Sequence, residues 1–487
     1  MIDTTAIRNK ILLFAMSGQL TEQIDEDGRA SDLLLRNNSK RSQLEKTGKI
    51  KKEKKLPAPP DEEKYFEIPS SWEWIYMGDI FLHNTGKALN SSDTEGELLD
   101  YITTSNLYWD RFELDSLKQM HFKPEEIEKC TITKGDLLVC EGGDIGRSAI
   151  WKYDYDMRIQ NHIHKLRAIL AEEICAEFYF YVMMLYKQNN WINGRGIGLQ
   201  GFSSKRLHSL VVPLPPYAEQ QRIVEQISDA FAILNKIDSL QQQYSEDINI
   251  LKGKLVDAGI RGVLTERLSE DGTAASLLHE LSEGRTELVR QGEIRKKKIL
   301  PKLQKTEYPF EIPRNWEWVH ISDVWAIING DRGKNYPAKS TLSHTGIPFI
   351  SALNLDGETV VADEKLLCLS DEQYEKLGSG KLKKGDVVVC IRGSLGKHGK
   401  YPFDQGAIAS SLIIARNYLQ NEVINDYLMV YLDSRMFRDE IEKYNGGSAQ
   451  PNLAAESFEK FRVPLPPLAE QERIVTRVKE LFKSISE

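Results

Sequence analysis

Cysteine is scarce in this sequence, and the few cysteines are scattered. They lie at Cys130, Cys140, Cys175, Cys368 and Cys390, and no two of them form a C-x-x-C pair. A disulfide framework needs an even set of cysteines and a zinc site needs clustered ligands, so neither is predicted. Cys140 and Cys390 each close a short apolar run, which predicts a small buried side chain at the end of a strand.

Long apolar segments are also missing. No run approaches the roughly 18 apolar residues that a membrane-spanning helix needs. The N-terminus, MIDTTAIRNK, lacks the charged region and apolar core of a signal peptide. We therefore expect a cytoplasmic protein with no membrane partner.

The catalytic motifs that we considered are either absent or lack a required residue or structural context. There is no Walker A loop and no H-E-x-x-H, and HIH at 162–164 is the one cluster among nine histidines. GIGLQG at 196–201 fits a dinucleotide fingerprint in spacing but lacks its strand, turn and helix context. LPPY at 214–217 looks like the signature of amino-methyltransferases, but Leu214 cannot accept a hydrogen bond from an amine. We predict no catalytic residue, no metal and no bound cofactor.

An excess of positive charge is absent too, since the formal net charge is −8. Proteins that bind nucleic acid usually carry a basic footprint, so this value argues weakly against DNA binding. Two basic runs nevertheless occupy equivalent places in the two halves, and they are either DNA-phosphate contacts or solvated linkers. They comprise Lys51, Lys52, Lys54, Lys55, Arg295, Lys296, Lys297 and Lys298.

What the sequence does have is a cyclic repeat. VPLPPYAEQQRIV at 212–224 recurs as VPLPPLAEQERIV at 463–475, a shift of 251 residues. GVLTERLSEDG at 262–272 matches GQLTEQIDEDG at 18–28, a shift of 244 residues, and this shift holds without a gap from Lys10 to Asp79. The middle of the chain thus contains, fused, what the two ends contain separately. This order is typical of a molecule with pseudo-two-fold symmetry.

Composition and landmarks define the fold class. A chain of 487 residues with 41% hydrophobic residues suggests three or four globular domains. Each half carries an F-E-I-P and W-E-W entry, a K-G-D strand with a glycine-rich turn, and an aromatic-rich helix. We predict an α+β protein with two similar mixed α/β domains, separated by long antiparallel, coiled-coil-like helices.

The helical part is predicted from a seam of apolar residues with a period of 3.5, which indicates lengthwise packing on a partner helix. Proline favours the first turn of a helix, so the Pro-Pro element introduces it. We expect one continuous helix against two terminal helices; a hairpin turning near Gln241 is the alternative. The seam comprises Ile223, Ile227, Leu234, Ile237, Tyr244, Ile248, Leu251 and Leu255, with Ile7, Ile11, Ile474, Val478 and Leu481 at the chain ends.

Polar residues on matching turns differ between the halves, and as a set they favour a role in recognition. Amides, hydroxyls and arginine are the groups that read base edges in DNA. Each one alone is better explained as a turn former or cap, and only the set as a whole favours recognition. The base-contact candidates are Thr103, Thr104, Ser105, Asn106, Asp144, Arg147, Gln160, Asn161, His162 and Gln200 in the first half, and Ser351, Asn354, Arg392, Ser394, Lys397, His398, Ser410, Ser411, Gln450 and Asn452 in the second.

These duplicated motifs, in this cyclic order and over nearly the whole length, closely resemble the specificity (S) subunits of type I restriction-modification systems. The resemblance implies target-recognition domains at 62–212 and 306–463, a central helical spacer at 213–305 and helical regions at 1–61 and 464–487.

The resemblance also implies a function in which each domain reads one half of a bipartite site in double-stranded DNA. Two methyltransferase subunits would supply S-adenosylmethionine and adenine methylation. Two restriction subunits would supply translocation and cleavage with ATP and Mg²⁺. A bivalent protein scaffold without DNA binding and a stand-alone methyltransferase or nuclease are the alternatives.

Overall fold

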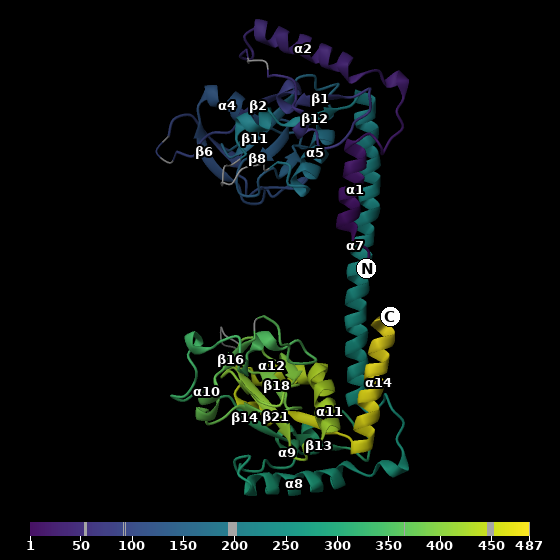
Figure 1. Ribbon diagram of the computed structural model, residues 1–487, viewed down its shortest axis with the longest axis vertical. Helices are drawn as coiled ribbons and strands as arrows, with labels where there is room; N and C mark the ends of the chain where they lie inside the picture. The colour runs from purple at the N-terminus through teal and green to yellow at the C-terminus, as the bar shows by residue number, and fades with distance from the viewer. Residues whose placement is uncertain are drawn as a thin grey trace. The chain divides into compact units, whose positions relative to one another are not determined.

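The computed structural model describes residues 1–52, 56–90, 92, 94–192, 202–364, 366–445 and 452–486. The chain forms two compact units, Met1–Gln242 and Gln243–Glu487. Their boundary falls inside one helix, α7 (Tyr217–Ile260), so each unit includes half of it (Figure 1). The continuity of α7 excludes the hairpin near Gln241.

The first unit mixes helices and short strands. In chain order its elements are α1 (Thr4–Met16), η1 (Asp25–Asp27), α2 (Ala30–Lys46), η2 (Asp61–Glu63), β1 (Glu73–Tyr76), α3 (Met77–Ile80), β2 (Phe81–Thr85), β3 (Glu97–Ile102), β4 (Leu107–Tyr108), β5 (Arg111–Phe112), β6 (Lys118–Phe122), α4 (Pro124–Cys130), β7 (Thr131–Ile132), β8 (Leu137–Cys140), β9 (Ser148–Ile150), β10 (Met157–Ile159), β11 (Ile163–Ala168), α5 (Ala176–Gln188), α6 (Ser204–His208) and β12 (Val211–Leu214).

The second unit repeats this succession with local changes. Its elements are η3 (Ser269–Asp271), α8 (Ala274–Arg290), η4 (Lys305–Glu307), β13 (Glu317–His320), α9 (Ile321–Val324), β14 (Trp325–Asn329), η5 (Lys339–Thr341), β15 (Ile347–Ile350), η6 (Ala352–Asn354), β16 (Leu367–Leu369), α10 (Asp371–Lys376), β17 (Lys381–Leu382), β18 (Val387–Cys390), β19 (His398–Lys400), β20 (Gly406–Ile408), β21 (Leu412–Asn417), α11 (Glu422–Asp433), α12 (Arg435–Tyr444), α13 (Ala455–Phe458), β22 (Arg462–Leu465) and α14 (Leu468–Ser486).

The sheets of the two units have the same strand order. The first unit has sheets β2-β11-β8-β9 and β6-β3-β10-β7, and the second has β14-β21-β18-β19 and β16-β15-β20-β17. The parallel pairs also correspond, because β3 pairs with β10 and β15 with β20. Cys140 and Cys390 are fully buried at the ends of β8 and β18, as predicted. These matches confirm two similar mixed α/β domains.

The repeated Val-Pro-Leu-Pro-Pro element forms a strand and then starts a helix. β12 pairs with β1, and β22 pairs with β13, both antiparallel. These are two-stranded sheets, so a proline in the strand costs no bond to a second neighbour. The Nε2 atom of Gln220 donates to the carbonyl of Pro215 at 2.9 Å, and Gln471 does the same to Pro466 at 2.9 Å. Helices α7 and α14 therefore begin in the same way.

A buried tryptophan and glutamate pair fixes each of these helices to its unit. Trp72 Nε1 donates to Glu219 at 2.7 Å, and Trp316 Nε1 donates to Glu470 at 2.8 Å. Gly262 lies against Trp316 and Pro313. Its φ of +69° suits glycine, and an added Cβ would lie 2.6 Å from Pro313 Cγ. The sequence repeat is thus explained by an interaction that both units need.

We expect Trp316→Phe to lower the free energy of unfolding of the second unit by about 1.5–3 kcal/mol, because the buried Glu470 carboxylate loses a donor. Denaturant titration of the full chain measures the change. Trp318→Phe is the matched control, since its Nε1 bonds a neutral carbonyl, that of Phe310, at 3.3 Å and should cost only about 1 kcal/mol. Equal losses in the two variants would contradict this role for Glu470.

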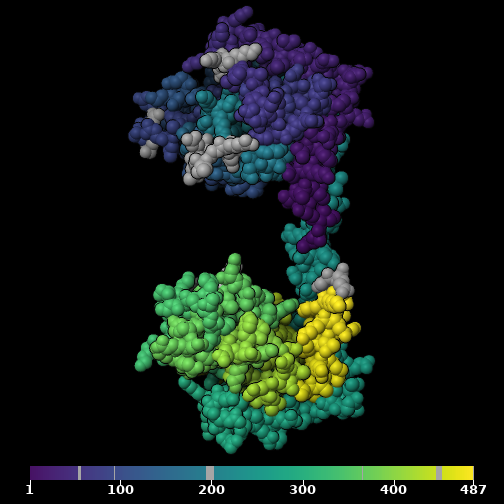
Figure 2. All heavy atoms as spheres, in the orientation of Figure 1, coloured from purple at the N-terminus to yellow at the C-terminus, as the bar shows by residue number. Residues whose placement is uncertain are grey.

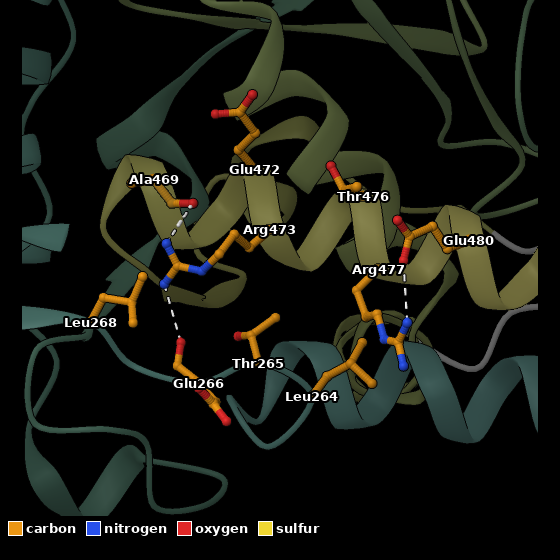
Figure 3. A pocket seen from close by; sticks show the side chains of 10 residues that line it. All are labelled: Leu264, Thr265, Glu266, Leu268, Ala469, Glu472, Arg473, Thr476, Arg477 and Glu480. Carbon is orange, nitrogen blue, oxygen red and sulfur yellow. Dashed lines mark hydrogen bonds and ion pairs between the residues drawn. The ribbon is translucent and has the colours of Figure 1, made fainter.

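Antiparallel helix pairs form in both units. In the first, α1 lies along the N-terminal half of α7, with Arg8 paired to Asp238 at 2.8 Å. In the second, α14 lies along the C-terminal part of α7 (Figure 2). Gly259 faces Ile474 there. Arg473 of α14 also bonds the carbonyl of Glu266 at 3.1 Å (Figure 3). One helix is therefore shared by two partner helices, as predicted.

The apolar seam is buried along the N-terminal part of α7 and on α14, and is exposed or only partly buried from Tyr244 to Leu255. Ile223, Ile227, Leu234, Ile474 and Val478 are buried. The partly exposed members are Ile11, Ile237, Ile248, Leu255 and Leu481. The exposed members are Ile7 at 39%, Tyr244 at 59% and Leu251 at 44%. The prediction of a seam that is buried along its whole length within the chain is therefore wrong at Tyr244 and Leu251. The reason is that α1 covers only the first half of α7, and α14 covers only part of the second.

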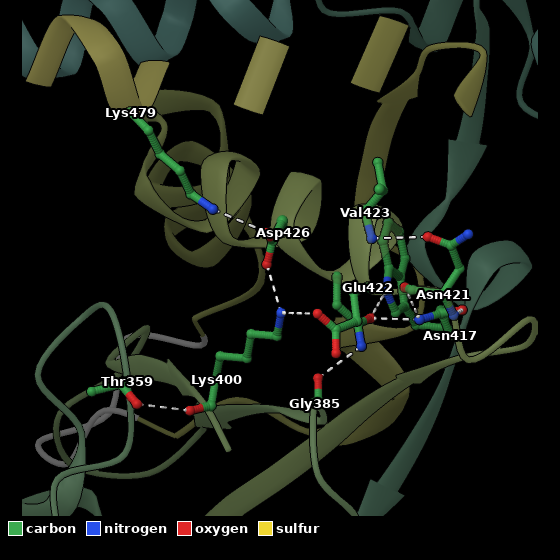
Figure 4. Close-up of polar contacts among 11 residues, drawn as sticks. Thr359, Gly385, Lys400, Asn417, Asn421, Glu422, Val423, Asp426 and Lys479 are labelled. Atoms are coloured by element: carbon green, nitrogen blue, oxygen red, sulfur yellow. Dashed lines mark hydrogen bonds and ion pairs between the residues drawn. The ribbon is translucent and has the colours of Figure 1, made fainter. Parts of the chain in front are cut away.

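Polar bonds tie the second mixed α/β domain to α14. Lys400 of β19 and Lys479 of α14 both bond Asp426 of α11, at 2.8 and 3.0 Å (Figure 4). Burial raises the pKa of Asp426, but these two hydrogen bonds outweigh it and hold the pKa below its usual value. In the first unit the corresponding aromatic-rich helix, α5, packs on α1 and also contacts the N-terminal part of α7, where the ring of Tyr181 lies 5.9 Å from that of Phe231. Each aromatic-rich helix thus contacts the helix that starts at the Pro-Pro element of its own unit.

Candidate nucleic-acid interface

Three turns converge at one edge of each unit, and the same backbone hydrogen bonds join them in both. In the first unit these bonds link Gln160 to Ile102, Glu141 to His162, and Phe202 to Glu141, at 2.9–3.0 Å. In the second they link Ala409 to Ile350, Ile391 to Ser411, and Leu453 to Ile391, at 2.8–2.9 Å. Those predicted base-contact residues that the structure describes lie on or beside these turns, so the fold gathers them at one place in each unit.

The asparagines at the ends of β3 and β15 shape their own turns. Asn106 accepts from the backbone N–H of Thr103 at 2.9 Å and donates to the carbonyl of Glu113 at 3.0 Å. Asn354 accepts from the backbone N–H of Ser351 at 2.9 Å. Thr103, Asn106 and Asn354 are buried, so we no longer count them among groups that reach DNA.

His398 is also a structural residue. Its side chain is buried, its Nδ1 lies 2.8 Å from the carbonyl oxygen of Gly396, and its ring packs edge-on to Phe437. Its Nε2 lies 3.3 Å from the Asp433 carboxylate at the end of α11. His398 is therefore not a base-contact candidate. The prediction was wrong because the sequence does not show that this side chain is buried.

In the first unit the glycine-rich turn is tied to its neighbours. Arg147 donates to the carbonyl of Thr104 at 2.6 Å, and Asp144 pairs with Lys187 at 2.8 Å. Two guanidinium groups lie over the ring of Tyr108, that of Arg147 at 5.2 Å and that of Arg111 at 4.7 Å from the ring centroid. Tyr108 and Arg111 were not among the predicted base-contact residues, although the sequence shows an arginine three residues after a tyrosine.

The remaining candidates of this unit lie at its surface. Ser105 and His162 are exposed, and Thr104, Gln160 and Asn161 are partly exposed. His162 Nδ1 lies 3.6 Å from the Glu141 carboxylate. Their side chains are therefore placed where a ligand can reach them.

In the second unit the glycine-rich turn carries exposed cations. Arg392 Nε donates to the Asn452 amide oxygen at 3.2 Å, and Lys397 donates to the carbonyl of Ala352 at 3.2 Å. Ser394 is exposed. The sequence did not predict Arg332, which donates to the carbonyl of Ser410 at 3.3 Å. A Gly-Asp-Arg-Gly-Lys run directly after a strand was the available signal.

The basic run Arg295–Lys298 lies beside strand β14. Lys297 bonds the carbonyl of Ile327 at 3.0 Å and pairs with Glu459, so it covers the strand edge. Arg295 and Lys298 line a cavity of about 650 Å³ with Arg332, and Lys296 is exposed. Lys51 and Lys52 are exposed in the first unit, whereas four predicted residues, Lys54, Lys55, Gln200 and Gln450, lie outside the described residues.

The described residues offer neither a metal site nor a membrane-spanning helix. No group of three or more His, Cys, Asp or Glu among them is arranged to hold a metal ion. Within the same ranges, no helix combines the length and apolar character needed to cross a membrane.

Two histidines contact each other on neighbouring strands of the first unit, His83 on β2 and His164 on β11. His83 Nε2 is 3.0 Å from His164 Nδ1, and His164 Nε2 is 2.6 Å from the carbonyl oxygen of Phe202. Burial, with His164 and His208 nearby, lowers the pKa of His83 to about 3. Burial also lowers the pKa of His164. The equivalent strand positions of the second unit hold isoleucines, Ile327 and Ile413.

We expect the first unit to lose stability selectively in acid. Unfolded histidine takes up a proton near pH 6.5, but folded His83 does so only near 3, so its contribution is complete above about 6.5. The free energy of unfolding should then fall by about 1.4 kcal/mol per pH unit between these values. Unfolding of the full chain from pH 7 to 4, compared with His83→Ile/His164→Ile, measures this slope. Exposed His279→Gln is the control; a slope unchanged in the double variant would refute the assignment.

The family described as the type I restriction modification DNA specificity domain matches twice, at residues 69–243 and 313–487. The chain belongs to this family. One copy lies in each half, and the two copies are related by the 244-residue shift of the sequence repeat.

Individual relatives of this specificity family cover nearly the whole chain. The specificity subunit of the type I restriction enzyme EcoAI from Escherichia coli is 24% identical, over 98% of this chain and 89% of its own length. That of the putative enzyme MjaX from Methanocaldococcus jannaschii is 23% identical, over 85% and 88%. A solved structure described as the structural basis of complex assembly and conformational transition of the type I R-M system covers 86% of this chain and 92% of its own, with a TM-score of 0.53 and 18% identity. That last similarity concerns the fold alone.

Proposed function

We propose that this specificity protein reads a bipartite DNA site, one half with each recognition domain. The observation that supports this most directly is the identical backbone framework of the convergent turns, which carries different polar side chains in the two units. A shared framework holds DNA in one orientation, while different side chains select different bases. Arg392 and Lys397 stand on the second framework where Gly142 and Arg147 stand on the first.

The chemistry would come from partner subunits. We propose that two methyltransferase subunits supply S-adenosylmethionine and methylate adenine, and that two restriction subunits use ATP and Mg²⁺ for translocation and cleavage. The chain itself would act without catalysis and without a cofactor, in the cytoplasm where cellular DNA is available. The names of its relatives, which are specificity subunits of restriction enzymes, support this division of labour.

Repeated surfaces support two docking positions. A groove of about 600 Å³ lies between α14 and the segment after α7, lined by Leu264, Leu268, Ala469 and Thr476 among others (Figure 3). The repeat places Leu20, Ile24, Ala218 and Glu225 at the equivalent positions of the first unit. We propose these as places where methyltransferase subunits dock, together with the exposed apolar residues near the middle of α7.

The test uses the full chain assembled with methyltransferase subunits from its own host. The complex should methylate a split site, and its DNA affinity should fall steeply as salt rises, because phosphate contacts release counterions. A bivalent protein scaffold would show neither property. Methylation by the purified chain alone would instead establish the stand-alone enzyme.

A further inference from the structure

The loop after β14 presents an arginine that the family assignment does not single out. Asp331 accepts from the backbone N–H groups of Gly333 at 2.7 Å and Gly378 at 2.8 Å, and these bonds hold the pKa of Asp331 below its usual value. Asn335 donates to the carbonyl of Lys376 at 2.8 Å. The loop is therefore built before any ligand binds, and Arg332 extends from its centre.

Arg332 lies beside the second set of convergent turns. Its guanidinium donates to the carbonyl of Ser410, and the backbone N–H of Ser410 donates to the Tyr336 hydroxyl at 3.5 Å. Desolvation lowers the pKa of Arg332, and the nearby charge of Arg392 lowers it further. The fold thus holds two like charges together, one from the loop after β14 and one from the turn after β18.

Over the described residues, both guanidinium groups bond only neutral oxygens, those of Ser410 and Asn452. Arginines that stabilise this unit instead pair with carboxylates: Arg416 with Asp386 at 2.6 Å, and Arg473 with Asp271 at 2.6 Å. Two adjacent, exposed guanidinium groups without a carboxylate repel each other and keep their donors free. Such a pair is suited to acceptors supplied by a ligand.

The pair belongs to the second unit alone. The strand register places Ala88 of the first unit where Arg332 stands, and the repeat places Gly142 where Arg392 stands. A feature needed for the common fold would occur in both units. The pair is therefore a difference between the two units and not a part of their common fold.

We propose that Arg332 and Arg392 together contact DNA in the second half-site and that Arg332 is a residue determining its recognition. The proposal rests on the proposed function. The acceptors are guanine O6 and N7 or phosphate oxygens, which offer the same paired geometry to a guanidinium group.

The experiment compares Arg332→Gln, Arg332→Lys, Arg392→Gln and the double glutamine variant, each in the full chain assembled with methyltransferase subunits. A pool of split sites randomised in both halves reports the methylated sequence, and DNA binding between 50 and 200 mM salt reports the charge contribution. Arg435→Gln is the control, because this exposed arginine lies on α12, where its backbone N–H bonds Asp257 of α7.

A guanine contact predicts relaxed preference at one position of the second half-site by about tenfold or more, with the first half-site unchanged, and Arg332→Lys would not restore it. A phosphate contact predicts weaker binding to all sequences and a salt slope reduced by about 1 per arginine, which Arg332→Lys would restore. Either result supports the proposal that the arginine pair contacts DNA. The proposal would be overturned by a double variant that melts at the wild-type temperature and shows the wild-type half-sites and the wild-type salt slope. A wild-type complex that methylates no split site would instead overturn the proposed function itself.

Discussion

Seven residues inserted between Gln242 and Gln243 should abolish methylation at the native split site and transfer it to sites with a longer spacer. The insertion point lies within α7, at the boundary between the two units. One heptad lengthens a helix by about 10.5 Å while nearly preserving the facing of both ends, and this corresponds to about 3 base pairs at 3.4 Å each. Both half-sites should stay the same, because the recognition turns are untouched.

Methylome sequencing of cells expressing the variant with its methyltransferase measures the spacer directly. The same seven residues inserted between Pro301 and Lys302, outside α7, serve as the control and should leave the spacer at its native length. If the α7 insertion leaves the spacer unchanged as well, α7 does not set the distance between the half-sites.

A fragment of residues 1–245 should pair with itself and direct methylation to a palindromic site built from the first half-site alone. It contains one copy of each repeated part: α1, the first recognition domain and the first half of α7. The first unit, Met1–Gln242, has its own core around Trp72, Tyr179 and Ile223, so the fragment includes what it needs to fold. A second copy then takes the place of the second unit.

Light scattering and methylome sequencing test this prediction together. Residues 1–212, which lack the first half of α7, should give no dimer and no methylation. A folded 1–245 fragment that stays monomeric and inactive would show that the sequence repeat does not reflect interchangeable units.

Much of the fold could be predicted from the repeat. A motif that occurs twice at a fixed shift must be explained by an interaction that occurs twice, and Trp72 with Glu219 and Trp316 with Glu470 are that interaction. The helix starts after the Pro-Pro elements and the burial of Cys140 and Cys390 followed from local chemistry alone. Strand order did not, because it depends on pairings between distant residues.

The candidate site was predicted less well, for a physical reason. Asn106 and Asn354 have side chains that suit base recognition, but short amides also bond their own turns, and in both units they do so. Arg332 was missed because its loop has no matched motif in the first half. Tyr244 and Leu251 fit a heptad, yet a period says which face is apolar and not how far a partner helix extends.

Mapping methylated adenines across the host genome with and without this gene tests the central claim most directly. The account predicts one bipartite motif, with two different halves and a fixed spacer, that disappears when the gene is deleted and returns with the full chain. An unchanged methylome, in a host whose methyltransferase subunits are expressed and active, would contradict the claim that this protein directs them to DNA.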